Sequence, residues 1–139
     1  MLRTLLKREE SYAVHALLNI AENPGINAAD IAERLKLPAA FIAKVLRKLV
    51  EVGFVESKMG RGGGVTLKVK LENISLLEAI EAISGSLILD TCQAQPRCAT
   101  QRRKGHCSLK VVWLTTTLEI RDLLAKVKLS QLVDHPVLN

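Results

Sequence analysis

Aromatic residues are scarce in this chain of 139 residues, which has one Trp, one Tyr and two Phe although 48% of its residues are hydrophobic. The core must therefore be built from Leu, Val, Ile and Ala, a composition that favours helices. No apolar run is long enough to span a bilayer, and residues 1–10 are charged too early for the core of a signal peptide. We therefore expect a small, helix-rich protein that stays in the cytoplasm and has no membrane partner.

Cysteine is also rare, and three thiols are an odd number for a disulfide framework. The histidines His15, His106 and His135 are dispersed along the chain, and the glycine-rich stretch 59–64 lacks the Lys-Ser/Thr ending of a phosphate-binding loop. No strong catalytic constellation emerges, which argues against an enzyme or an electron carrier that uses the thiols. We therefore expect that the protein is not an enzyme.

Positive charge is concentrated in one segment. Residues 36–70 contain two acidic residues, Glu51 and Glu56, against eight basic ones, which are Lys36, Lys44, Arg47, Lys48, Lys58, Arg61, Lys68 and Lys70. This segment accounts for the whole net charge of +6, so the rest of the chain is neutral overall. Such an excess indicates a surface for a polyanion, and the simpler alternative is a solvated basic face.

Hydrophobic spacing predicts three helices in the first part of the chain, over residues 8–22, 28–35 and 38–52. Asn27 can cap the second helix through its side chain. Pro38 suits the first turn of the third helix, because its missing N–H would have no partner there in any case.

Two short segments rich in β-formers follow, at residues 54–58 and 65–69. The loop between them, residues 59–64, contains four glycines, which let its backbone approach a surface closely. A further helix over 76–84 is predicted from the capping box that begins at Ser75.

The longest predicted helix runs from Ser108 to about Lys128 and follows an irregular stretch, residues 86–107, that contains all three cysteines and is called the cysteine segment below. Its inward residues repeat at the spacing of a heptad seam: Leu109, Trp113, Thr116, Ile120, Leu123 and Val127. Such a helix would reach roughly 30 Å, too long for so small a domain to cover. We expect a partner helix from a second copy of the chain, the alternative being a helix packed only on its own domain.

Three helices followed by a two-stranded ribbon are the order of a winged helix-turn-helix. The predicted fold class is therefore mainly α with a small β-ribbon, a winged helix-turn-helix plus a long C-terminal dimerisation helix. We expect residues 1–75 to form the DNA-binding domain. Residues 76–139 would then contain the cysteine-loop sensor region and the dimerisation helix.

The predicted DNA-binding residues lie on the third helix and in the glycine loop. Lys44, Arg47 and Lys48 give the third helix a cationic side that can lie in a major groove of double-stranded DNA. Arg61, at the tip of the glycine loop, can enter the adjacent minor groove. The alternatives are an ordinary hairpin with a flexible tip and a winged helix that binds only proteins.

Several runs share the pattern of one family, namely Tyr12–Val14, Ile31–Leu35, Phe41–Leu49, Gly53–Ser57, Gly60–Leu67, Ile74–Ile80 and the three cysteines followed by Leu109 and Trp113. Together they resemble the winged helix-turn-helix transcriptional regulators of the IscR/NsrR-like family, over essentially the whole chain. The resemblance implies a homodimeric transcription factor that binds a pseudo-palindromic operator. It also implies that a long helix crosses between subunits and that the cysteine loop holds an iron–sulfur cluster.

The start of the third helix departs from that family, whose members often have small polar or acidic side chains there. This chain has Pro38, Ala40 and Ala43 at those positions. Ala40 remains among the positions expected to contact DNA, whereas hydrogen-bond readout would rely on Lys44, Arg47 and the ribbon. The operator sequence is expected to differ accordingly.

By the resemblance, Cys92, Cys98 and Cys107 are the cluster ligands, and their spacing is C-x5-C-x8-C. We favour a 2Fe–2S over a 4Fe–4S cluster. A cluster usually has four protein ligands, but the family's usual fourth positions hold Lys110 and Ser11 in this chain.

Two histidines remain as candidates for the fourth ligand. His106 lies next to a cysteine, although consecutive ligands strain the backbone, and His15 lies on the first helix, where some relatives use a histidine. A lone histidine on a helix is more often structural. Glu9 and Glu10 are also available, but we interpret them as solvated first-turn charges that favour the helix dipole.

Two alternatives do without a cluster. Zinc could be held by the three cysteines and His106, although the usual short C-x2-C knuckle is absent. A cluster-free thiol redox sensor is the other alternative, because neighbouring cations can lower thiol pKa values; these cations are Arg97, Arg102, Arg103 and Lys104.

Overall fold

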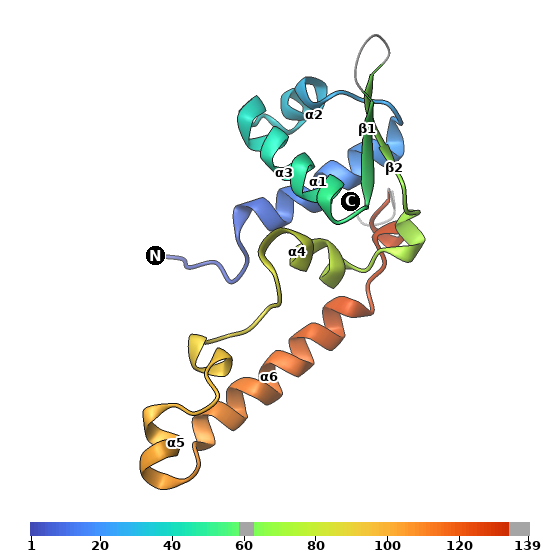
Figure 1. The fold of residues 1–139 in the computed structure, drawn as a ribbon. Helices are drawn as coiled ribbons and strands as arrows, with labels where there is room; N and C mark the ends of the chain where they lie inside the picture. The colour runs from blue at the N-terminus through green and yellow to red at the C-terminus, as the bar shows by residue number, and fades with distance from the viewer. Residues whose placement is uncertain (59–62, 134–139) are drawn as a thin grey trace.

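The computed structural model describes residues 1–58 and 63–133 of the chain. It begins with three helices and a two-stranded ribbon (Figure 1), whose bounds are α1 Arg8–Glu22, α2 Ala28–Leu35, α3 Ala39–Glu51, β1 Val55–Lys58 and β2 Gly64–Leu67. The two strands are antiparallel and form the wing, with Val55 opposite Leu67 and Lys58 opposite Gly64. The winged helix-turn-helix order predicted from the sequence is confirmed, with small shifts at the ends of the elements.

Local hydrogen bonds and backbone angles explain where these elements begin and end. The Oδ1 atom of Asn27 accepts the N–H of Asp30 at 2.8 Å and caps α2, as predicted. Pro38 stands just before α3 rather than inside its first turn. Gly53 follows α3 with a φ of 84°, a conformation that a side chain would oppose, and so lets the chain turn into β1.

The second half of the chain is helical as well, with η1 Leu71–Asn73, α4 Leu76–Ser84, η2 Thr91–Ala94, α5 Ala99–Lys104, α6 Ser108–Ala125 and η3 Leu129–Leu132. The prediction of a wholly irregular cysteine segment is therefore wrong. Short-range hydrogen bonds order it: Asp90 Oδ1 accepts the N–H of Cys92, and Gln101 Oε1 accepts the N–H of Cys98, each at 3.1 Å. Such side-chain bonds to the backbone stabilise short helical turns.

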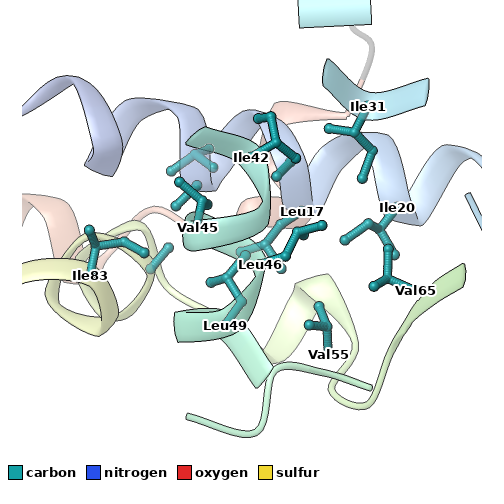
Figure 2. Packing of buried hydrophobic residues seen from close by; sticks show 14 of the residues in the cluster. Leu17, Ile20, Ile31, Ile42, Val45, Leu46, Leu49, Val55, Val65 and Ile83 are labelled. Atoms are coloured by element: carbon teal, nitrogen blue, oxygen red, sulfur yellow. The ribbon is translucent and has the colours of Figure 1, made fainter. Parts of the chain in front are cut away.

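The hydrophobic core lies where α1 meets α3, α4 and the wing (Figure 2). The largest fully buried side chains are Leu17, Ile20, Ile31, Ile42, Val45, Leu49, Val55, Ile74 and Leu129. All are aliphatic, as the scarcity of aromatic residues requires. Tyr12 and Phe41 pack at the edge of this core instead, with their ring centroids 6.0 Å apart.

Helix α6 projects away from this core and is anchored at its C-terminal end (Figure 1). There the N–H of Leu76 donates to the carbonyl of Val127 at 2.8 Å, and the N–H of Leu129 donates to the carbonyl of Ile74 at 2.9 Å. Lys128 has an extended backbone between these two bonds, and α6 ends at Ala125, before the predicted limit of about Lys128. Along the described residues, no helix is long and apolar enough to cross a membrane.

The wing is fastened to the turn between α1 and α2 by backbone contacts. The N–H of Gly25 donates to the carbonyl of Val65, and the N–H of Val65 donates to the carbonyl of Ile26, both at 2.9 Å. Gly64 lies so close to this turn that a Cβ atom would stand 2.0 Å from the Gly25 oxygen. The position of the wing beside α2 and α3 therefore depends on glycine at residue 64.

Replacing Gly64 with alanine should destabilise the fold, because the added methyl group would collide with backbone atoms that cannot rotate away. We expect the Gly64→Ala variant to lose about 1–3 kcal/mol of unfolding free energy, the usual cost of overpacking. Urea denaturation at fixed protein concentration measures this loss. The control is Thr66→Ala in the same strand, and equal stability of the two variants would contradict the close approach of strand and turn.

Candidate nucleic-acid interface and thiol site

One face of α3 is buried and the opposite face is open to solvent. The buried face consists of Ile42, Val45, Leu46 and Leu49. Because these recur at helical spacing, Ala40, Ala43 and Arg47 lie on the other side and are exposed. The exposed face carries no acidic residue in the first turn of the helix.

A groove of about 570 Å³ lies beside this face, between α3, the start of α2 and the wing. Its lining consists of Asn27, Ala28, Ala43, Leu46, Arg47, Val50, Ser57, Lys58, Gly63, Gly64 and Val65. Two cations, Arg47 and Lys58, border it from opposite sides. Lys58 belongs to the basic segment but is not among the predicted site residues, although its place next to the glycine loop could have indicated this role.

The other two predicted cations of α3 turn away from the groove, towards α1 and α4. The ammonium group of Lys44 lies 3.5 Å from Glu9 Oε1, and that of Lys48 lies 3.9 Å from Glu9 Oε2. Lys48 also donates to the carbonyl of Ile83 at 3.0 Å. Arg47 is thus the predicted cation of α3 that borders the groove, while Arg61 lies outside the described residues.

The acidic residues at the start of α1 do not match their expected role as solvated charges. Glu10 is 5% exposed, and its Oε2 atom accepts the backbone N–H of Lys7 at 2.9 Å. Glu9 pairs with Lys44 and Lys48 instead of standing free. The interpretation of both as solvated first-turn charges is wrong, because each one caps the helix or neutralises a neighbour.

The cysteine segment, with α5, lies at the end of α6 farthest from the core (Figure 1). Cys92 lies in η2, Cys98 is the residue before α5, and Cys107 is the residue before α6; all three are half-buried and free. The sulfur of Cys107 accepts the N–H of Lys110 at 3.4 Å. Cys107 lies close enough to Cys98 to lower the pKa of the Cys98 thiol.

Lys110 closes the cysteine segment from within. Its side chain is buried, with a residue exposure of 8%, and its ammonium donates to the carbonyl of Gln95 at 2.7 Å and to Gln101 Oε1 at 3.2 Å. From the sequence, Lys110 is distinguished only by its place at one of the family's usual fourth-ligand positions. The structure adds a role that spacing does not reveal, because the lysine ties the middle of the cysteine segment, on both sides of Cys98, to α6.

The surroundings shift the thiol pKa values in opposite directions. The backbone N–H of Gln101 lowers the pKa of Cys98 below its ordinary value, and smaller effects in the same direction come from Thr100, Cys107 and Lys110. Burial raises the pKa of Cys92, with a further increase from the Asp90 carboxylate. Cys98 is therefore the more readily ionised of these two thiols.

The donor set offers an iron–sulfur cluster three thiols, and the family's usual fourth position holds no ligand. Three sulfurs are the soft ligands that iron prefers, but Lys110 holds the expected fourth position with a protonated amine. His106 is exposed, and His15 lies on α1 with its ring 5.8 Å from that of Tyr12. Among residues 1–58 and 63–133, no three His, Cys, Asp or Glu side chains are grouped closely enough to hold a metal ion.

Comparison with known proteins places these features in a family. The Rrf2 model, described as an iron-dependent transcriptional regulator, matches residues 6–135. The HTH-type transcriptional regulator IscR of Vibrio campbellii is 31% identical over 132 residues, which cover 91% of this chain and 76% of the relative. Such relatives are transcriptional regulators by name and not enzymes.

Solved structures show the same fold. T. potens IscR matches with a TM-score of 0.72 at 23% identity, covering 94% of this chain and 85% of the other. Staphylococcus aureus CymR matches with a TM-score of 0.68 at 22% identity, covering 93% of this chain and 98% of the other.

The opposite pKa shifts predict the order in which the thiols react. At neutral pH, iodoacetamide should alkylate Cys98 before Cys92, because the thiolate is the nucleophile and the lower pKa gives more of it. Each cysteine lies on its own tryptic peptide, since Arg97, Arg102 and Lys104 separate them, so mass spectrometry can follow each rate. Labelling in concentrated urea is the control and should abolish the difference; faster labelling of Cys92 in the folded protein would contradict these environments.

Proposed function

The chain belongs to the Rrf2 family of transcriptional regulators, and from this membership we propose that the state of the three thiols in the cysteine segment controls how it binds DNA. That the protein is a DNA-binding regulator follows from its family. This control of DNA binding by the thiols is supported chiefly by one observation: Cys92, Cys98 and Cys107 share one segment, which the buried Lys110 ties to α6.

In this proposal, residues 1–75 bind double-stranded DNA through α3 and the wing. Arg47 and Lys58 face the groove from its two sides, and Arg61 would add a contact in the minor groove. Lys44 and Lys48 contribute to the basic potential of this region while their ammonium groups are paired with Glu9. A pseudo-palindromic operator would follow from two copies of this surface in one dimer.

The proposed homodimer uses the apolar surface of α6. Within the chain, the residues of α6 that are buried are Lys110 and Thr117, neither of which belongs to the predicted heptad seam. Large apolar side chains remain exposed along the helix, namely Leu109, Val111, Val112, Leu114, Leu118 and Leu123. At 100° per residue, Leu109, Val112 and Leu123 lie on one side of the helix, and Val111, Leu114 and Leu118 lie on the opposite side. Exposed apolar surface of this kind is typical of a protein interface, so a second α6 is its proposed cover.

We propose that the cysteine segment holds an iron–sulfur cluster, of the 2Fe–2S type in preference to 4Fe–4S. Cys92, Cys98 and Cys107 would be three of its ligands, and His106 or His15 would supply the fourth. The presence of such a cluster in the cysteine segment would depend on the supply of iron and on oxidants. The ammonium of Lys110 would lower the electrostatic cost of placing negatively charged thiolate ligands together.

A route from the cysteine segment to α3 runs through the end of α4. The N–H of Leu87, near the start of the cysteine segment, donates to Glu81 Oε2 at 2.6 Å, and Arg121 of α6 pairs with the same carboxylate. The carbonyl of Ile83, on the same helix, accepts the ammonium of Lys48 from α3. A shift of the cysteine segment or of α6 would therefore reach the recognition helix through packed and hydrogen-bonded groups.

A second candidate is a thiol sensor without a cluster, which the lowered pKa of Cys98 and the proximity of Cys107 favour. A peroxide could oxidise these two thiols to one disulfide, with both thiol hydrogens leaving in the water that forms. The low pKa of Cys98 would make it the attacking thiolate.

The main test compares DNA binding with and without the thiols. Duplexes selected from a random library by the purified protein provide the probe. Affinity for them should differ by about 5–150-fold between anaerobic and oxidised protein, the usual range of coupling. A variant with all three cysteines replaced by alanine should bind DNA equally under both conditions. If that variant keeps the wild-type difference in affinity, the proposal is overturned.

The same preparations distinguish the two candidates and test the dimer. Visible absorption with matching iron and sulfide supports the cluster, whereas an iron-free, colourless protein that still responds to peroxide supports the thiol sensor, and zinc analysis covers the third possibility. His15→Ala and His106→Ala, compared with each other, identify the fourth ligand by loss of absorption. Sedimentation at micromolar concentration should give the mass of a dimer, and a monomer would contradict the role of α6.

The route through α4 predicts a specific uncoupling variant. Lys48→Met removes the hydrogen bond to Ile83, so the affinity ratio between the two thiol states should fall towards one. Lys44→Met is the matched control, because it removes a cation that pairs with Glu9 but makes no bond to α4, and it should keep the ratio. If both variants keep the wild-type ratio, the signal does not pass through Lys48.

A further inference from the structure

We propose that the start of α3 reads thymine methyl groups, through contacts with the exposed side chains of Ala40 and Ala43. This inference rests on the proposed DNA-binding surface and names what that surface recognises. The first residues of a recognition helix are those that contact base edges in a helix-turn-helix. In this protein those residues present methyl groups.

The exposed face at the start of α3 offers no hydrogen-bonding side chain. Pro38, Ala39, Ala40 and Ala43 are all exposed, and none has a side-chain donor or acceptor. Lys44, the first polar residue of the helix, is 3.5 Å from Glu9 on the α1 side. Direct hydrogen bonding to bases is therefore excluded over the first turn, and apolar contact is the recognition that these side chains can provide.

The major groove contains one apolar group that distinguishes the bases, the C5-methyl of thymine, and alanine is among the side chains that contact it. The exposed alanines of α3 are also short, which allows the helix to lie close to the bases. Ala43 lines the groove between α3 and the wing, beside Arg47. A thymine methyl that enters this groove meets an alanine on α3 and loses contact with water.

Arg47, on the same face of α3, can add a hydrogen-bonding contact to the proposed methyl contacts. It lies seven positions after Ala40, about two helical turns or roughly 10 Å along the axis. The guanidinium can bind guanine O6 and N7 in a bidentate manner. Since base pairs are spaced by about 3.4 Å, each half-site should contain thymine roughly three base pairs from a guanine.

Uracil tests the proposal, because it pairs like thymine and lacks only the methyl group. Duplexes selected from a random library by the full-length protein are resynthesised with uracil at one thymine at a time, and fluorescence anisotropy at fixed salt gives each Kd. We expect binding to weaken about fourfold at the contacted thymines of each half-site, the value of one buried methyl group. Other thymines should tolerate uracil.

The variants Ala40→Gly and Ala43→Gly assign the contacts to residues. Each removes one methyl from the protein, so the ratio of uracil to thymine Kd should fall towards one at the thymine that it contacts and remain at the other. Ala99→Gly is the matched control: it removes an exposed alanine near the start of α5, at the far end of α6, and should leave every ratio unchanged.

The outcomes separate this inference from the proposed function. Specific duplexes that bind equally well with uracil at every thymine, or that contain no common thymine, overturn the methyl reading while the DNA-binding function stands. Failure to select or bind any duplex overturns the proposed function itself. Loss of the uracil effect in Ala40→Gly or Ala43→Gly, but not in Ala99→Gly, is the result that supports the inference.

Discussion

Burial of α1 between α3 and α4 is the packing interaction on which the rest of the structure depends. Leu17 and Ile20 have no exposed surface, and a fully buried aliphatic side chain contributes about 1.5–3 kcal/mol. Ile83 of α4 and Leu129, which follows α6, belong to the same core. The surface proposed for DNA and the anchored end of α6 are thereby held against one helix, so a change at one has a packed path to the other.

The basic residues of the recognition helix have separate tasks. Arg47 faces the groove beside the wing, whereas Lys44 and Lys48 lie against Glu9 on the opposite side. Surface ion pairs of this kind contribute little to stability. Their main effect is to hold the two lysine side chains on the α1 side of the helix. Of the three predicted cations on α3, Arg47 therefore faces the groove where DNA is proposed to bind.

The elements that local patterns control could be predicted from the sequence. Apolar spacing placed α1, α2 and α3, and Asn27 and Ser75 cap their helices through the expected bonds. The destinations of Lys48 and Lys110 could not be predicted, because their partners are distant along the chain or lie in a loop with no repeating pattern. The ordering of the cysteine segment was missed for a related reason, since its short helices depend on single side-chain bonds and not on periodicity.

The candidate site was predictable in its residue types but not in its arrangement. The thiols and the basic segment are visible in the composition, and family resemblance connects them. The spacing C-x5-C-x8-C does not reveal that two of the three thiols stand at helix starts, or that a lysine fills the space where a ligand was expected.

The place of Cys107 at the start of α6 has a consequence for folding. Its sulfur accepts a backbone N–H of the first turn, so the atom that would bind iron or an oxidant also caps the longest helix of the chain. Loss of a helix cap costs on the order of 1 kcal/mol. Chemistry at this sulfur would therefore change how far α6 frays, and the helical content at that end would report the chemical state of the thiol.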